Sequence, residues 1–404
     1  MLIDKTIVLG ITGGIAAYKA ADLASKLTQT GAKVKVVMTK SATEFVAPLT
    51  FWSVTGEAVI TEMFDPSTKP GITHITLADA ADLVAIVPAT ANIMAKLASG
   101  IADDMLTCVV LATKAPIVIA PAMHSNMYEN PVTQDNLAKL KARGFVIVEP
   151  EYGRLASGAM GMGRLAEIGK ITGTIQQVLG RSGDLTGRRI VVTAGGTREA
   201  IDPIRYIVNR SSGKMGYAVA EAARDRGAQT TLITAPTALP DPAGVDIVRI
   251  TSAVQMKEAV TEATTKADAL IMAAAVADYQ PKSAAKQKIK KEATGADLTL
   301  ELVRTPDTLA EVKGDFIKVG FAAESKDRLM EHAKKDELER KKLDLVVAND
   351  ISTPDSGFEV DTNKVLLIDK EGNVEDLPLM SKREVAERVL DKVVGMLGSK
   401  KKGA

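Results

Sequence analysis

Two glycine-rich segments and two loop histidines are the residues of this chain whose types and spacing best suit chemistry. The segment NRSSGKMG, residues 209–216, places small residues and a lysine immediately before an apolar helical run. Backbone N–H groups at the start of a helix can hold an anion. The spacing differs from a Walker A loop, which needs Gly, four residues and then Gly-Lys-Ser/Thr. This segment therefore predicts an anion site of another kind.

A second turn, GITGGIAAYK at residues 10–19, places Gly13 and Gly14 between an expected strand and an expected helix. Its backbone N–H groups could receive one phosphate. The turn lacks the G-x-G-x-x-G spacing, and no acidic residue follows the next strand to bind a ribose. A mononucleotide is therefore favoured over a dinucleotide. A tight turn without any ligand is the alternative.

The chain has three histidines, and two of them are candidates for acid–base chemistry. His332 lies in a strongly charged helical run, where a solvated position is expected. His74 lies in GITHITLA, and His124 lies in APAMHSNMY after an apolar strand. Either one alone would more often be structural. Two loop histidines at the ligand end of one sheet favour a role in chemistry.

The elements that must position these residues recur in two halves of the chain. Residues 5–39 and 188–235 each predict an apolar strand, a glycine-rich turn, an amphipathic helix and a second strand. ADLVAIVPATAN then matches ADALIMAAAVADY, and KAPIVIAPAM matches KLDLVVANDI. Alternating strands and helices predict parallel sheets whose ligands bind at the carboxyl ends of the strands. We expect an α/β fold of two doubly wound, Rossmann-like domains, at residues 1–189 and 190–404.

The amino-acid composition limits the kinds of partner that the protein is expected to bind. The 404 residues are 46% apolar and 25% charged, with a formal net charge of +1. This balance is typical of a soluble globular protein and provides no field that would favour nucleic acid or a membrane. Cys108 is the only cysteine, and we expect it to be a small buried apolar residue. No apolar run is long enough for a membrane span and no signal peptide is evident, so a cytoplasmic location is expected.

The motifs ITGGIAAYKA, THITLA, VPATAN, GIADDMLT and PAMHSNMY, in this order, resemble those of flavin-dependent cysteine decarboxylases. With the second half, nearly the whole chain resembles the bifunctional phosphopantothenoylcysteine decarboxylase/phosphopantothenate–cysteine ligases of coenzyme A synthesis. The resemblance implies that the first half binds FMN, oxidises the substrate thiol and then releases carbon dioxide. It assigns the base near the thiol to His74 and the substrate carboxylate to Met123 and His124. The implied FMN ligands are Gly13, Thr39, Thr90 and Asn92.

The chain departs from the family pattern in this half. Many relatives have Asn where His124 stands and Trp where Tyr128 stands. Some relatives have a cysteine in a mobile flap, which donates the final proton, where this chain has Ser157. Serine is a far weaker acid than cysteine, so the donor is left open between an assisted Ser157, another group and water.

For the second half, the resemblance implies that CTP activates the carboxylate of 4′-phosphopantothenate as an acyl-cytidylate, which cysteine then attacks. Asn209 and the segment 209–216 would hold the acyl-nucleotide and the phosphopantothenate end. A plain helix cap by Ser211 or Ser212 is the alternative. Asp278 would hold Mg²⁺ against the triphosphate, and Lys288 would be the catalytic lysine. The remaining implied contacts are Ala274, Pro306, Asp307, Phe321 and Lys341, whereas Glu337 stands where the family has a further lysine.

The resemblance also implies a large homo-oligomer of trimeric flavoprotein units and dimeric ligase units. Two other functions are open at this point. An NAD(P)-dependent reductase would have two Rossmann-like halves, but the dinucleotide glycine spacing and the ribose-binding acid are missing. A flavin-binding regulatory protein without turnover would not need His74 or a complete ligase half.

Overall fold

The structure is a computed structural model that describes residues 2–64, 73–290, 298–324, 338–350 and 360–402. His332 and Glu337 lie outside the described residues. The chain divides into two compact units, Met1–Leu179 and Gly180–Ala404, and each is considered by itself. The domain boundary at 189/190 stays a prediction. In the described part of the chain, no helix combines the length and the apolar character that crossing a membrane requires.

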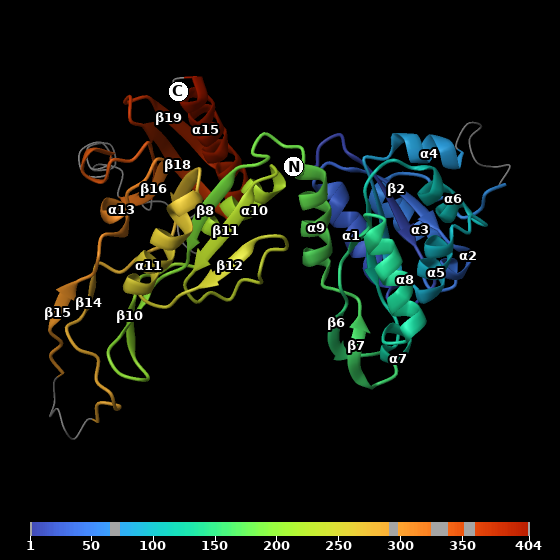
Figure 1. Ribbon diagram of the computed structural model, residues 1–404, viewed down its shortest axis with the longest axis horizontal. Coiled ribbons are helices and arrows are strands. Elements are labelled where there is room, and N and C mark those ends of the chain that lie inside the picture. The colour runs from blue at the N-terminus through green and yellow to red at the C-terminus, as the bar shows by residue number, and fades with distance from the viewer. Residues whose placement is uncertain (1, 65–72, 291–297, 325–337, 351–359, 403–404) are drawn as a thin grey trace. The chain divides into compact units, whose positions relative to one another are not determined.

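The first unit is built on a five-stranded parallel sheet in the order β2-β1-β3-β4-β5 (Figure 1). Its strands are β1 (Thr6–Ile11), β2 (Lys33–Met38), β3 (Leu83–Ala89), β4 (Ile117–Pro121) and β5 (Val146–Ile147). A hairpin of two antiparallel strands follows, β6 (Glu151–Arg154) and β7 (Met160–Arg164).

Helices cover both faces of this sheet. Alternate residues of a strand point to opposite faces, so each strand contributes side chains to two buried clusters. Ile7 and Leu9 of β1 belong to one buried cluster, and Val8 belongs to the other. The first cluster contains α1 (Ala17–Gln29), α3 (Pro48–Thr55) and α9 (Ile168–Gly180). The second contains α4 (His74–Ala80), α5 (Ala91–Ser99), α6 (Met105–Ala112) and α8 (Pro131–Ala142). Two short helices, α2 (Lys40–Thr43) and α7 (Ser125–Tyr128), follow strand ends.

The second unit has an eight-stranded sheet in the order β12-β11-β8-β13-β16-β17-β18-β19. Its parallel strands are β8 (Arg189–Ala194), β11 (Gln229–Thr234), β12 (Asp246–Arg249), β13 (Ala269–Met272), β16 (Ile317–Glu324) and β17 (Leu345–Asp350). The antiparallel edge pair is β18 (Thr362–Asp369) and β19 (Val374–Ser381). One face packs on α10 (Lys214–Asp225) and α15 (Lys382–Lys402), the other on α11 (Ala253–Ala263) and α13 (Thr308–Glu311).

Two short strand pairs extend from this unit beyond the central sheet. They are β9 (Arg198–Ala200) with β10 (Tyr206–Val208), and β14 (Tyr279–Pro281) with β15 (Leu302–Arg304). Figure 1 shows β10, β14 and β15 at the same end of the second unit, and β14 lies beside β9.

The expected α/β fold with two doubly wound units is confirmed, with two differences. The match of KAPIVIAPAM to KLDLVVANDI is wrong, because β4 lies next to β3 whereas the strand next to β13 is β16 and not β17. The antiparallel pair β18–β19 was also not predicted. Its turn carries a hairpin signal, since Gly372 has a φ of +88° and the Asn373 N–H donates to the Asp369 carboxylate at 2.8 Å.

Candidate active sites

The turns that follow β1, β2 and β3 pack into one surface at the carboxyl edge of the first sheet. Gly13 lies so close to α2 that a Cβ on Gly13 would stand 2.4 Å from the Cβ of Ser41. Thr12 links the first turn to the third, because its hydroxyl donates to the Pro88 carbonyl at 2.7 Å and accepts from the Thr90 N–H at 3.1 Å. Two of the four predicted cofactor residues, Gly13 and Thr90, therefore belong to one contact network.

Thr39, the third of these residues, presents a buried polar atom at the same edge. Its N–H donates to the Ile11 carbonyl at 3.0 Å, which holds Thr39 beside the end of β1. Its hydroxyl is buried, does not cap α2 and makes no hydrogen bond within the described part of the chain. A buried hydroxyl without a partner costs on the order of 1–3 kcal/mol. Thr39 lies beside two turns whose backbone N–H groups could bind a phosphate. A polar ligand bound at this edge would give the Thr39 hydroxyl a hydrogen-bond partner.

The start of α5 provides the last part of this edge. The Thr90 hydroxyl caps the helix by accepting the Ile93 N–H at 3.3 Å, and Asn92 is exposed in the first turn. The first turn of a helix carries N–H groups without intrahelical partners. Thr90 and Asn92 thus stand where a phosphate or a ribose could be held.

The loop of Met123 and His124 is fixed by the hairpin of β6 and β7. The Met123 N–H donates to the Gly163 carbonyl at 3.0 Å. Gly163 has a φ of +128°, and a Cβ there would lie 2.2 Å from the Met123 carbonyl oxygen, so only glycine fits this approach. His124 caps α7, with Nδ1 accepting the Asn126 N–H at 3.3 Å. Ser157 is exposed in the turn of the same hairpin.

Tyr128 anchors the other end of α7. Its hydroxyl donates to the Glu149 carboxylate at 2.6 Å, and Lys141 donates to the same carboxylate at 2.6 Å. Burial and the hydrogen bond to Glu149 raise the pKa of Tyr128 well above its usual range, so the hydroxyl stays a donor. Tyr128 therefore holds the end of this helix against Glu149.

His74 is the first residue of α4 and is half-buried. Thr73 caps this helix in a reciprocal pair with Thr76, which fixes the backbone at His74. None of the described contacts joins His74 to Gly13, Thr39 or Thr90. Proximity of this histidine to the flavin edge therefore stays a prediction.

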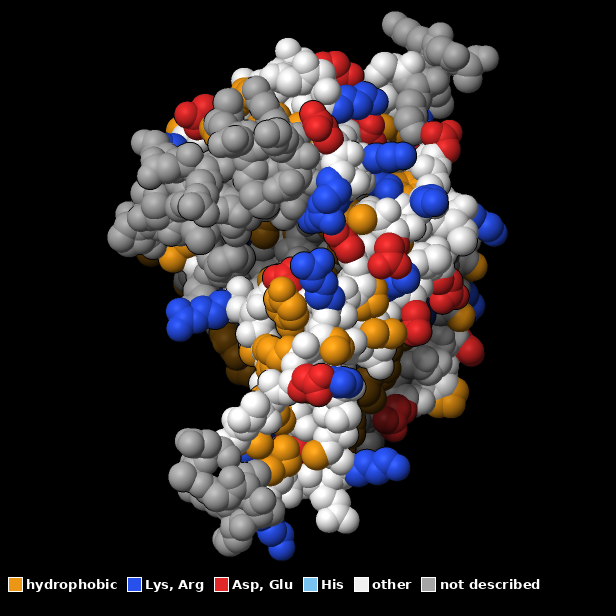
Figure 2. All heavy atoms as spheres, turned by 90° about the vertical axis from the view of Figure 1, so that its left-hand side faces the viewer, with side chains coloured by type: hydrophobic (Ala, Val, Ile, Leu, Met, Phe, Trp, Pro, Cys, Tyr) orange, Lys and Arg blue, Asp and Glu red, His pale blue; other side chains and the backbone are white. Residues whose placement is uncertain are grey.

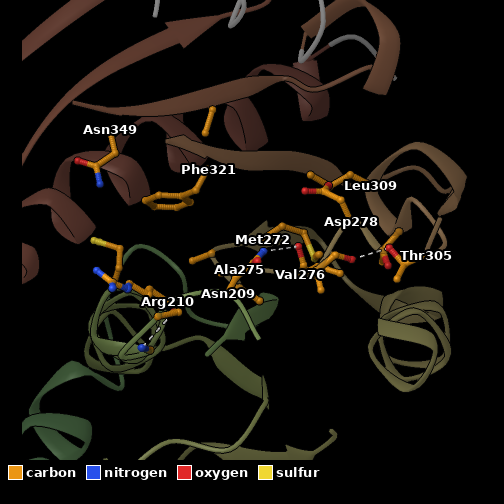
Figure 3. A pocket seen from close by; sticks show the side chains of 18 of the residues that line it. Asn209, Arg210, Met272, Ala275, Val276, Asp278, Thr305, Leu309, Phe321 and Asn349 are labelled. Carbon is orange, nitrogen blue, oxygen red and sulfur yellow. Dashed lines mark hydrogen bonds between the residues drawn. The ribbon is translucent and has the colours of Figure 1, made fainter. Parts of the chain in front are cut away.

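The second unit contains a cavity of about 910 Å³ at the carboxyl ends of its strands (Figure 3). Its walls come from the segment before α10, the loop after β13, the segment 304–309, and residues of β16, β17, β18 and α15. Seven of the eight residues predicted to act in this half line it, and Lys288 does not. The seven are Asn209, Ala274, Asp278, Pro306, Asp307, Phe321 and Lys341.

The start of α10 forms one wall of this cavity. Asn209 donates from Nδ2 to the Val276 carbonyl at 3.0 Å, which joins the wall to the loop after β13. A Cβ at Gly216 would lie 2.5 Å from the Thr193 carbonyl oxygen, so glycine lets the helix pack directly on β8. The N-cap is Gly213, with a φ of +79° and no capping side chain. Neither Ser211 nor Ser212 is the N-cap residue, but their hydroxyls accept the N–H groups of Gly213 at 3.4 Å and Lys214 at 3.5 Å, so the alternative of a structural role at this helix start stays open.

Basic side chains outnumber acidic ones in the lining of this cavity, which favours an anionic ligand. The face in Figure 2 shows Lys and Arg interspersed with Asp and Glu, so it carries no broad basic surface among its described residues. The basic lining residues are Arg210, Lys214, Arg304, Arg340, Lys341 and Lys382, and the acidic ones are Asp278 and Asp307.

Lys382 is a buried lining residue that the sequence analysis missed. It begins α15, is 5% exposed and donates to the Val360 carbonyl. Lys214, which also lines the cavity, pairs with Asp361 at 2.7 Å. Burial, together with the charge of Lys214, lowers the pKa of Lys382 to about 8. The sequence offered no signal, because Lys382 and Lys214 lie far apart in the chain.

Phe321 and Asn349 occupy one side of the cavity. Figure 3 shows the Phe321 ring directed into the space beside the Asn349 side chain. Asn349 is 6% exposed, and it was also missed from the sequence. An aromatic face next to an amide suits a heterocyclic base, since the ring provides stacking and the amide provides hydrogen bonds.

The described residues contain no cluster of three or more His, Cys, Asp or Glu side chains that could hold a metal ion. Asp278 is the predicted magnesium ligand, and its backbone carbonyl accepts the Thr305 N–H at 3.0 Å. Mg²⁺ is commonly bound by one or two carboxylates together with substrate phosphates and water. The prediction for Asp278 therefore depends on a bound phosphate.

Comparisons with known proteins cover nearly the whole chain. The model named Flavoprotein matches residues 1–180, and that of the DNA/pantothenate metabolism flavoprotein C-terminal domain matches residues 185–397. The coenzyme A biosynthesis bifunctional protein CoaBC of Bacillus subtilis is 45% identical over 402 residues, 98% of each chain. CoaBC of Mycobacterium tuberculosis is 45% identical over 412 residues, 98% of this chain and 97% of that one. A crystal structure of a CoaBC C-terminal domain is 40% identical, covers 54% of this chain and 100% of its own, and has a TM-score of 0.46.

Proposed function

The chain belongs to the family of coenzyme A biosynthesis bifunctional proteins, and we propose that it converts 4′-phosphopantothenate, cysteine and CTP into 4′-phosphopantetheine. The enzyme is bifunctional, with a flavoprotein decarboxylase domain followed by a ligase domain. The observation that best supports the ligase proposal is the basic cavity that gathers seven predicted residues. The family assignment does not support an NAD(P)-dependent reductase or a regulator without turnover.

The ligase reaction needs activation because a carboxylate is a poor electrophile. In our proposal a carboxylate oxygen of 4′-phosphopantothenate attacks the α-phosphorus of CTP and pyrophosphate leaves. The cysteine amine then attacks the acyl carbon, and CMP leaves as the amide forms. Asn209 would hold the acyl-nucleotide, the basic lining would neutralise the phosphates, and Lys288 would stabilise charge that develops during transfer. Asp278 would contribute one carboxylate to a magnesium ion that the triphosphate also binds.

The first unit fits FMN at the edge formed by Gly13, Thr39, Thr90 and Asn92, where the buried Thr39 hydroxyl needs a polar partner. FMN, when bound, accepts the hydride that the substrate CH₂–SH group must lose before its carboxylate can leave. We propose that His74 takes the thiol proton. The Met123–His124 loop would orient the substrate carboxylate. The donor of the final proton stays open, with Ser157 as one candidate.

The assembly is proposed from the family resemblance alone. It would be a homo-oligomer in which flavoprotein units form trimers and ligase units form dimers.

The ligase proposal is tested by omitting cysteine from a reaction with CTP, 4′-phosphopantothenate and magnesium. We expect a single burst of pyrophosphate that matches the number of active sites, and steady release once cysteine is added. Steady release without cysteine would overturn the proposed order of steps. A reaction with ATP in place of CTP measures the nucleotide preference.

Thr39→Val is expected to weaken FMN binding about five- to tenfold, because it removes one hydrogen bond worth roughly 1 kcal/mol. The flavin-free protein should be no less stable than the parent, since the valine replaces a buried hydroxyl that has no protein partner. FMN titration and thermal unfolding of the flavin-free form measure the two effects. Thr43→Val, which changes a half-buried threonine of α2 whose hydroxyl donates to the Lys40 carbonyl at 2.7 Å, is the control. Lower stability of Thr39→Val with unchanged FMN affinity would contradict the assignment of the Thr39 hydroxyl to the FMN site.

Anion binding to the second cavity should weaken as pH rises through about 8, where Lys382 loses its proton. Phosphate groups keep their charge over this range, because their second pKa is about 6. If binding requires protonated Lys382, the Kd of CTP rises about tenfold between roughly pH 7 and pH 9. Lys382→Arg should give a nearly constant Kd, since arginine stays charged. A Kd that rises equally in parent and Lys382→Arg would show that another group is responsible.

A further inference from the structure

Asp202 holds a buried carboxylate in the turn between β9 and β10, and its acceptor capacity is fully used. The residue is 3% exposed. One carboxylate oxygen accepts the N–H groups of Ile204 and Arg205 at 2.9 and 2.8 Å. The other accepts the Arg205 guanidinium at 3.0 and 2.5 Å, and the N–H of Ile289 at 3.2 Å. The last contact joins this turn to a segment that lies far along the chain.

Two further hydrogen bonds attach the same segment to the turn. Arg205 donates to the Ile289 carbonyl at 3.0 Å, and the Ala285 N–H donates to the Ile201 carbonyl at 2.9 Å. Residues 285–289 are therefore fixed at both ends. Lys288 lies between these two attachment points, immediately before Ile289. Its side chain is exposed.

The carboxylate of Asp202 stays ionised over the physiological pH range. The Arg205 guanidinium and the backbone N–H donors hold the pKa of Asp202 far below its usual range. The carboxylate thus stays charged, and Arg205 stays charged as well. Loss of this carboxylate would leave the Arg205 guanidinium and three N–H groups without their acceptor. The segment 285–289 would then keep the Ala285 contact and the contact of its Ile289 carbonyl with Arg205, and the carboxylate would no longer hold that arginine in place.

The attachment matters because the segment that it holds carries Lys288. Lys288 does not line the cavity, although the loop that carries it leaves the cavity wall at Asp278 and Tyr279. A lysine on a free loop would spend much of its time in unproductive positions, and holding a charged group in place is a major part of catalysis.

We infer that Asp202 is a positioning residue for Lys288: it fixes the 285–289 segment so that the lysine reaches the phosphates in the cavity during ligation. This inference rests on the proposed ligase function. A purely structural role of Asp202 would lower stability without acting through Lys288, and the two roles give different kinetics.

The test uses the full-length enzyme and a double-mutant cycle. Asp202→Asn should lower kcat for pyrophosphate release about 10- to 100-fold, with the KM for CTP within threefold of the parent. In a Lys288→Met background, Asp202→Asn should lower kcat less than twofold further, because the group that it positions is already gone. Asp241→Asn, which breaks the exposed pair with Arg249, is the matched control and should leave kcat unchanged.

Ile289→Pro provides a second variant if Asp202→Asn folds poorly. It removes the N–H that the carboxylate accepts from this segment and also restrains the backbone of Ile289 and Lys288, and it should lower kcat in the same way. The inference is overturned if Asp202→Asn lowers kcat by the same factor with and without Lys288, or if well-folded variants retain parental kcat. A parent enzyme that releases no pyrophosphate would instead overturn the proposed ligase function.

Discussion

His74→Asn is expected to lower carbon dioxide release by about 10²- to 10⁴-fold, the usual contribution of a positioned general base. Pyrophosphate release should be unchanged, because His74 belongs to the first unit and the proposed ligase residues belong to the second. The measurement follows labelled carbon dioxide and pyrophosphate in the same reaction. Flavin absorbance of the purified variant shows whether FMN is retained.

His124→Asn is the matched control for this prediction. It makes the same chemical change in another loop of the same unit and introduces the residue that many relatives have. An asparagine there can still accept the Asn126 N–H that His124 accepts at 3.3 Å. We expect decarboxylation to stay within threefold of the parent. If His124→Asn abolishes carbon dioxide release and His74→Asn does not, the roles assigned to the two histidines are reversed.

Lys288→Met is expected to lower pyrophosphate release about 10²- to 10³-fold, the range seen when one charge-stabilising donor is removed. The Kd of CTP should change little, because Lys288 does not line the cavity where the nucleotide would bind. Rapid-quench kinetics give the rate of pyrophosphate release, and calorimetry gives the Kd.

Lys286→Met is the control for this second prediction, since Lys286 is an exposed lysine of the same segment. It should leave both the rate and the Kd unchanged. A loss of CTP affinity equal to the loss of rate in Lys288→Met would show that this lysine binds the ground state. Such a result would remove the assigned role in the transfer step.

Much of the fold could be predicted because the strands carry local signals. β1 and β3 of the first unit are short apolar runs followed by small-residue turns. β8 and β13 of the second unit have the same features and occur in the same order along the chain. The antiparallel pair β18–β19 was missed because the Asp369–Asn373 turn was not weighed as a hairpin signal. The match of β4 to β17 failed because buried parallel strands have similar compositions, so local similarity does not determine their order in a sheet.

The residues of the candidate sites also fall into those that could be predicted from the sequence and those that could not. Asn209, Asp278 and Phe321 could be placed in one cavity from the sequence because they lie on motifs that resemble a known family. Lys382 and Asn349 could not be placed in the cavity from the sequence, since they line it only because distant segments of the chain pack together. The buried, unpartnered hydroxyl of Thr39 is likewise a property of packing alone.

The most direct test of the central claim is a coupled reaction of the purified chain with 4′-phosphopantothenate, cysteine, CTP and magnesium. Pyrophosphate, 4′-phosphopantothenoylcysteine and carbon dioxide are followed separately. We predict that pyrophosphate and carbon dioxide form in equal amounts and that 4′-phosphopantetheine is the product. Release of neither pyrophosphate nor carbon dioxide from flavin-loaded protein, with CTP or with ATP, would contradict the account.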